Sequence, residues 1–178
     1  MSEAGGNRRI DRILSPGYGE GLQALALDEV RRRRDESLAE REYLSLLRRL
    51  LQGRLDILRG EAARREEGGD PAPLLEKLSD ILGSDAMRAG SRGELVRVPI
   101  PEEEMTLARR RVERLIADAT ISDAPSLSDD DLSRFTEVLE REERTVSDLR
   151  SEVITVHDRL QEELKRRYKE DLSQISTS

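Results

Sequence analysis

Two polar patterns with the same spacing occur in the two halves of this chain. In each pattern a serine is followed three residues later by an arginine and eight residues after that by an aspartate: Ser45, Arg48 and Asp56, then Ser147, Arg150 and Asp158. A carboxylate accepts hydrogen bonds from guanine N1–H and its amino group, and an arginine binds guanine O6 and N7 or a phosphate. The repeat therefore predicts a site for guanine and phosphate. The alternative is coincidence, because arginine and aspartate are common in this chain.

Neighbouring polar residues extend both patterns by one helical turn. Gln52 follows the first arginine by four residues, where the second pattern has Ile154. Glu143 precedes the second serine by four residues, where the first pattern has Arg41. On a helix these positions share one narrow stripe of the surface. The predicted ligand-binding residues are Glu42, Ser45, Arg48, Gln52, Asp56, Glu143, Ser147, Arg150 and Asp158.

Two long helices are expected to carry these stripes. Residues 22–67 hold a heptad seam formed by Val30, Ser37, Leu44, Leu47, Leu51, Leu55 and Leu58. Residues 128–175 begin with Ser128 as an N-cap and three aspartates, which favour a helix start. Their seam residues are Leu132, Phe135, Leu139, Glu142, Val146, Leu149, Val153, Val156 and Leu160.

The rest of the chain is expected to be a flexible end and a connection. Residues 1–21 are rich in glycine, which predicts a flexible segment before a single helical domain over residues 22–178. Short helices are predicted within residues 72–117, over 72–82 and from Pro101 to about Ala117.

The predicted fold is all-α, a long antiparallel coiled-coil hairpin of two helices with short helices in the connection. A parallel homodimer is the competing architecture. A register with Ser45 level with Asp158 also sets Asp56 level with Ser147. This register relates the two stripes by a pseudo-twofold axis and would suit a twofold-symmetric ligand.

These residues resemble the RsiG family of actinobacterial anti-sigma factors. That family carries E-x3-S-x2-R-x3-Q-x3-D on both long helices of an antiparallel hairpin and binds cyclic di-GMP there. The first pattern has Arg41 in place of the family's glutamate, and the second has Ile154 in place of its glutamine. The resemblance covers the two long helices.

The resemblance implies a function for the chain. Cyclic di-GMP, as a stacked dimer, would join the hairpin to a sporulation sigma factor of the WhiG-like, flagellar-type class. The sequestered sigma factor could not engage RNA polymerase, so transcription of its genes would be repressed.

Composition and motifs argue against several classes of function. The chain has no cysteine and one histidine, His157, which gives no support for a metal site and is expected to be a surface residue. No phosphate-binding loop and no nucleophile beside a base are recognisable, so an enzyme is not expected. The net charge of −7 argues against direct DNA binding, and no apolar run is long enough for a membrane span. We therefore expect a cytoplasmic protein.

Two other functions fit the sequence alone. The chain could be a structural coiled-coil adaptor whose stripes are ordinary surface without nucleotide binding. It could also be an arginine-bearing hairpin that contacts RNA, which its acidic net charge disfavours.

Overall fold

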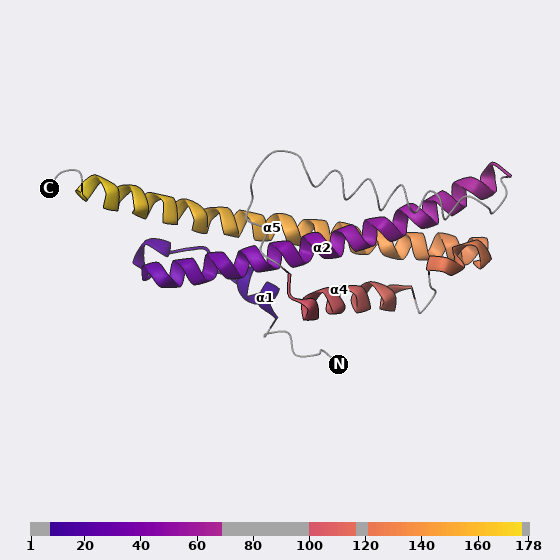
Figure 1. The fold of residues 1–178 in the computed structure, drawn as a ribbon, viewed down its shortest axis with the longest axis horizontal. Coiled ribbons are helices and arrows are strands. Elements are labelled where there is room, and N and C mark those ends of the chain that lie inside the picture. Colours follow the sequence, from indigo (N-terminus) through magenta and orange to yellow (C-terminus); the bar gives the residue numbers. More distant parts are fainter. Residues whose placement is uncertain (1–7, 69–99, 117–120, 176–178) are drawn as a thin grey trace. The chain divides into compact units, whose positions relative to one another are not determined.

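The structure is a computed structural model and describes residues 8–68, 100–116 and 121–175. These residues form four α-helices and two 3-10 helices: α1 (Arg9–Ile13), η1 (Leu22–Ala24), α2 (Leu27–Glu66), α4 (Glu102–Leu115), η2 (Ile121–Ser126) and α5 (Asp129–Ile175). No strand occurs in these ranges. The long helices α2 and α5 are each continuous (Figure 1). The predicted all-α fold with two long helices is confirmed.

The helix ends follow local chemistry. The backbone N–H of Asp131 donates to the Ser128 hydroxyl at 3.1 Å, so Ser128 is the N-cap that the sequence predicted for α5. Helix α2 begins at Leu27, later than predicted, because Gly21 has a φ of 58° and residues 22–24 form a 3-10 turn. Helix α4 follows Pro101 as predicted. The predicted helix over 72–82 lies outside the described residues.

Heptad seams hold α2 and α5 together. All seven seam residues predicted for α2 are buried, including Ser37, whose hydroxyl donates to a backbone carbonyl one turn earlier. On α5, Leu139, Val146, Val153 and Leu160 are fully buried. At about 1.5–3 kcal/mol for each buried aliphatic side chain, these seams dominate the packing energy.

The chain divides into two compact units. Unit 1 comprises residues up to 45 and residues from 146 onward, and unit 2 comprises residues 46–145. The sequence had predicted a single helical domain over 22–178. Each unit contains a short helix, a 3-10 helix, the first part of one long helix and the last part of the other.

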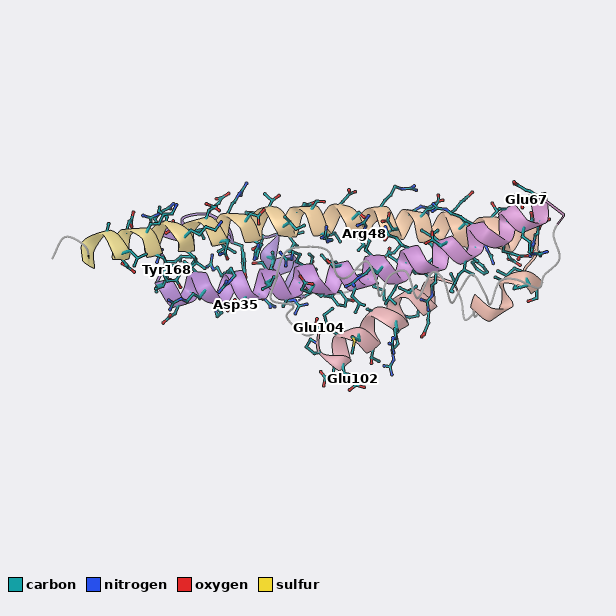
Figure 2. The ribbon with its side chains drawn as sticks, turned by 45° about the horizontal axis from the view of Figure 1, so that its top comes forward. Asp35, Arg48, Glu67, Glu102, Glu104 and Tyr168 are labelled. Atoms are coloured by element: carbon teal, nitrogen blue, oxygen red, sulfur yellow. The ribbon has the colours of Figure 1, made fainter. Side chains whose placement is uncertain are left out.

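Unit 1 pairs the start of α2 with the end of α5. Val30 packs in one cluster with Leu160 and Leu164. Arg31 donates to the Tyr168 hydroxyl at 2.9 Å, and Tyr168 lies near the end of α5 (Figure 2). Earlier residues of α2 therefore meet later residues of α5, which confirms the antiparallel pairing.

Residues 8–21 of unit 1, within the segment predicted to be flexible, form α1 and turns that contact α2. Arg9 forms an ion pair with Glu40, and Ile13 is buried. The Tyr18 hydroxyl donates to Glu36 at 2.8 Å, while Arg33 lies over the Tyr18 ring. These side chains connect the segment before α2 to the helix itself.

Unit 2 has an equivalent arrangement around α4. Ala108 and Val112 of α4 are fully buried, and Arg111 donates to Glu142 of α5 at 2.6 Å. Arg111 and Glu142 are each 102 residues after Arg9 and Glu40, which form the corresponding ion pair in unit 1. The two units therefore repeat a contact between a short helix and a long one.

Each unit contains a second repeated contact, which we call the arginine clasp. In unit 2 it consists of buried Glu61 with Arg64 and Arg65, and in unit 1 of buried Glu163 with Arg166 and Arg167. Arg65 also donates to the carbonyls of Ala124 and Leu127, and Arg167 donates to those of Leu22 and Leu25. All these residues again correspond at a spacing of 102.

The clasps hold their glutamates in the charged form. Hydrogen bonds from Arg64 and then Arg65 lower the pKa of Glu61 from 4.5 to about 2, against the opposing effect of burial. Hydrogen bonds from Arg166 and then Arg167 lower the pKa of Glu163 to about 2 in the same way. Each carboxylate therefore favours the folded state wherever it is ionised.

The predicted register of the hairpin is wrong by about one heptad. The prediction set Ser45 level with Asp158 and Gln52 opposite Arg150. Instead Ser45 contacts Arg150 in unit 1, and Gln52 contacts Glu143 in unit 2. Slipping by one heptad leaves every seam residue in the seam, so apolar spacing alone does not distinguish these registers. The clasps, which fix each long helix to the segment before the other, supply the missing information.

Candidate polar ligand site

The predicted ligand residues fall into two groups, one in each unit. We call Arg48, Gln52, Asp56 and Glu143 the unit 2 cluster. We call Glu42, Ser45, Ser147, Arg150 and Asp158 the unit 1 cluster. Each group combines residues from α2 and α5 within its own unit.

In the unit 2 cluster, two side chains of α2 converge on one carboxylate of α5. Arg48 Nε donates to Glu143 Oε1 at 2.9 Å, and Gln52 Nε2 donates to the same oxygen at 3.1 Å. Arg48 lies on the side of α2 that faces α5 (Figure 2). The two helices thus bring the arginine and glutamine of the first pattern to the glutamate of the second.

An open groove adjoins the unit 2 cluster. Its lining consists of Gln52, Leu55, Arg59, Glu140, Glu143 and Arg144. Asp56, one turn after Gln52, is exposed and forms no hydrogen bond or ion pair with any residue that the structure describes. The groove therefore presents carboxylates, an amide and guanidinium groups to solvent, which is the chemistry that guanine edges and phosphates require.

In the unit 1 cluster, the serine of one pattern contacts the arginine of the other. Arg150 Nε donates to Ser45 Oγ at 2.9 Å, while Ser45 Oγ donates to the Arg41 carbonyl at 2.7 Å. The Arg41 guanidinium forms an ion pair with Glu42 at 2.7 Å. Glu42 thus neutralises Arg41 and makes no contact with Arg150.

The remaining members of the unit 1 cluster lie on α5. Asp158 is exposed and borders a groove between α5 and the glycine-rich segment before η1. The Asp158 carboxylate lies 3.3 Å from Nδ1 of His157. Ser147 is half-buried, and its carbonyl accepts from Ser151 at 2.9 Å.

The prediction that His157 is a surface residue is wrong. His157 is only 9 % exposed and lies on the buried face of α5. Its position corresponds to Leu55 at the spacing of 102, so a polar ring occupies a seam position that is apolar in unit 2. The ring can lie there because its Nδ1 reaches Asp158 at the helix surface.

Sequence analysis missed residues that frame both clusters. Arg59, Glu140 and Arg144 line the groove beside Glu143, and Arg59 pairs with Glu140 at 2.8 Å. The two clasps were also missed, although Glu61-x2-Arg64-Arg65 and Glu163-x2-Arg166-Arg167 repeat at the same spacing as the two patterns. The repeat of the clasp residues lies just after Asp56 and Asp158 and is visible in the sequence.

With both clusters described, the chain can be compared with known proteins. Residues 16–82 match the RsiG-like family. This match agrees with the resemblance at the residues of the first pattern, and the second pattern lies outside the matched residues. The RsiG-like stretch contains the whole of the first pattern and of α2. No curated protein sequence matches the chain.

The RsiG-like match carries a general functional conclusion. It indicates an anti-sigma factor role, which implies a sigma factor as partner. RsiG-like anti-sigma factors are regulatory proteins and not enzymes.

None of the helices in the described ranges is long and apolar enough to cross a membrane. Within residues 8–68, 100–116 and 121–175, histidine and acidic residues do not gather into a group of three or more that could hold a metal ion.

Proposed function

We propose that this protein binds cyclic di-GMP through its two polar clusters and, with the nucleotide bound, sequesters a WhiG-like, flagellar-type sigma factor. The nucleotide joins the two proteins, and the sequestered sigma factor is kept from RNA polymerase. Transcription of the sigma factor's genes is then repressed while the nucleotide level is high. A fall in the nucleotide level releases the sigma factor.

The observation that carries this proposal is the convergence of Arg48 and Gln52 on Glu143. It joins the two sequence patterns through direct side-chain contacts, as a shared ligand surface requires. A coiled coil without a ligand has no need for matching polar stripes on two helices. The RsiG-like match of residues 16–82 supports the anti-sigma role independently of this contact.

The chemistry of the clusters supports cyclic di-GMP in particular. The exposed carboxylates of Asp56 and Asp158 can accept from the N1–H and amino group of a guanine. Arg48 and Arg150 can donate to guanine O6 and N7 or to a phosphate, and can stack on a base. Cyclic di-GMP carries guanines and phosphates, and each cluster contains a carboxylate and an arginine that can bind these groups.

Isothermal titration calorimetry with cyclic di-GMP, with and without the purified sigma factor, tests the proposal. We expect the wild type to take up the nucleotide in the presence of the sigma factor. Asp56→Ala and Arg150→Ala should strongly weaken nucleotide-dependent binding, with helix content by circular dichroism unchanged. Asp171→Ala and Arg134→Ala are matched controls, since they remove an exposed carboxylate and an exposed guanidinium outside both clusters.

The possible outcomes separate the candidate functions. If the wild type takes up no cyclic di-GMP even with the sigma factor present, the proposal fails. A sigma factor complex that forms equally well without nucleotide would contradict the role of the ligand and keep the anti-sigma role. RNA binding that weakens steeply with salt would instead favour an RNA-binding hairpin.

A further inference from the structure

The two polar clusters are chemically different, although they occupy equivalent places in the two units. At the spacing of 102, Arg48 corresponds to Arg150 and Asp56 to Asp158. The short helices, the clasps and the starts of α2 and α5 correspond at the same spacing. The surroundings of Arg48 and Arg150 can therefore be compared position by position.

The counter-charge is present at one arginine and missing at the other. Arg48 pairs with Glu143, which also holds Gln52. The position in unit 1 that corresponds to Glu143 is Arg41, and the position that corresponds to Gln52 is Ile154. Both departures from the pattern therefore fall in unit 1, one turn from Ser45 and one turn from Arg150 respectively.

Among the residues that the structure describes, the partner of the Arg150 guanidinium is a hydroxyl. Its guanidinium donates to Ser45 Oγ at 2.9 Å and forms no ion pair with any residue in the described ranges. Glu42 does not take this role, because its carboxylate binds Arg41 at 2.7 Å. Arg150 is half-buried, so water compensates its charge only in part.

These differences favour different ligand groups. An anion that approaches Arg150 neutralises a charge that the protein leaves uncompensated. An anion that approaches Arg48 meets the Glu143 carboxylate, which repels it and competes for the same guanidinium. Glu143, Gln52 and the exposed Asp56 can instead pair with the donors and acceptors on the edge of a base.

We propose that the two clusters bind different chemical groups of cyclic di-GMP. The unit 1 cluster binds a phosphate through Arg150, and the unit 2 cluster reads a guanine edge through Glu143 and Gln52. This division rests on the proposed function, because it assigns the two chemical parts of cyclic di-GMP. Arg41 and Ile154 account for the difference between the clusters, because they stand where the unit 2 cluster has an acidic residue and an amide.

The test measures affinity against salt for two matched arginine variants, with the sigma factor present throughout. The probes are cyclic di-GMP and cyclic di-AMP, and Lys165→Ala is the control because Lys165 is exposed and pairs only with Glu162. Arg150→Ala should raise the Kd for cyclic di-GMP about 100-fold and Arg48→Ala about 10-fold, the range expected for losing a charged hydrogen-bonding group. The rise of Kd with salt should become smaller in Arg150→Ala and stay unchanged in Arg48→Ala, because salt screens the attraction between Arg150 and a phosphate.

Two further variants separate phosphate binding from base reading. Glu143→Gln should reduce the preference for cyclic di-GMP over cyclic di-AMP, whereas Arg150→Ala should leave that preference intact. The double variant Arg41→Glu with Ile154→Gln makes the unit 1 cluster match the unit 2 cluster, and it should weaken the salt dependence without a change in helix content.

The results distinguish failure of this inference from failure of the proposed function. Equal losses of affinity and equal changes in salt dependence for Arg150→Ala and Arg48→Ala would overturn the division while leaving nucleotide binding in place. No uptake of cyclic di-GMP by the wild type would overturn both.

Discussion

Units 1 and 2 share their supporting contacts and differ in their ligand-facing ones. In both units a short helix is tied by an arginine to a glutamate of a long helix, and an arginine clasp holds the segment before the other long helix. The polar clusters do not follow this pattern, since Arg48 contacts a carboxylate and Arg150 a hydroxyl. The difference at positions 41 and 154 therefore arose on a common scaffold and does not reflect a different fold.

The largest expected change in the free energy of unfolding comes from the clasps, and it tests whether the two clasps are equivalent. Arg65→Ala and Arg167→Ala each remove hydrogen bonds to three backbone carbonyls and one partner of a buried glutamate. We expect each to lower the free energy of unfolding by about 2–4 kcal/mol, because buried charges are costly when a partner is removed. Urea denaturation followed by circular dichroism measures this loss.

Arg134→Ala provides the baseline for the clasp variants. Its guanidinium is exposed and pairs within one turn, so the loss should stay within about 0.5 kcal/mol. If only one of the two clasp variants is destabilised, the equivalence of the units as scaffolds does not hold.

Acid unfolding tests the clasps in a second way. The folded-state pKa of Glu61 and of Glu163 is about 2, below the ordinary 4.5. The unfolded chain therefore binds more protons than the folded protein between pH 4.5 and 2, so stability falls as the pH falls through this window. Above pH 4.5 the contribution of both glutamates is fully present.

Glu61→Gln and Glu163→Gln isolate this contribution from that of other carboxylates. Each variant should show a shallower loss of melting temperature than the wild type between pH 4.5 and 2. The two reductions should be similar, because the clasps have the same hydrogen bonds. A wild-type slope in both variants would argue against charged glutamates in the clasps.

A smaller effect is expected at the helix starts, where the units differ by one hydroxyl. Ser128 caps α5, and the corresponding residue before α2 is Ala26, whose side chain offers no acceptor. Ser128→Ala should cost about 1 kcal/mol of stability, while Ala26→Ser should add about 0.5 kcal/mol. Glu29, three residues after Ala26, completes a capping box in the serine variant. Thermal denaturation of the two variants in parallel checks the opposite signs.

The smallest expected change in the free energy of unfolding comes from the buried seam between α2 and α5. His157 and Leu55 occupy equivalent buried positions. His157→Leu should raise the free energy of unfolding by about 0.5–1 kcal/mol, because a buried polar ring is replaced by an apolar side chain. Leu55→His should lower it by a larger amount. A destabilised His157→Leu protein would show that the contact with Asp158 outweighs the gain in apolar burial.

Sequence periodicity predicted much of the fold. The seam residues of α2, the N-cap at Ser128 and the antiparallel pairing of two long helices depend on local spacing and are confirmed. The register was wrong because a heptad pattern looks the same after a slip of seven residues. Long-range contacts such as that between Arg167 and Leu22 determine the register, and the spacing of apolar residues does not reveal these contacts.

The sequence could supply candidate residues for the site, but it could not supply their arrangement. The repeat of Ser45 and Arg48 at positions 147 and 150 identified residues that contact across the helices. Their partners could not be predicted, since a pattern on each helix does not say which turns face each other. The observed register places Gln52 against Glu143 and Ser45 against Arg150. The departures at positions 41 and 154, each one turn away along its own helix, therefore both fall in unit 1.

The way α2 and α5 pass through both units determines the order in which the protein can fold. Unit 2 is one continuous stretch, residues 46–145, and its clasp joins residues 59 to 62 positions apart. Unit 1 combines residues up to 45 with residues from 146 onward, and its clasp spans 142 to 145 positions. During synthesis, unit 1 cannot be completed until the end of α5 has left the ribosome, and its loop closure is the costlier one. Arg150 therefore meets Ser45 only after all of unit 2 has been synthesised, so products that end before Arg150 lack this contact.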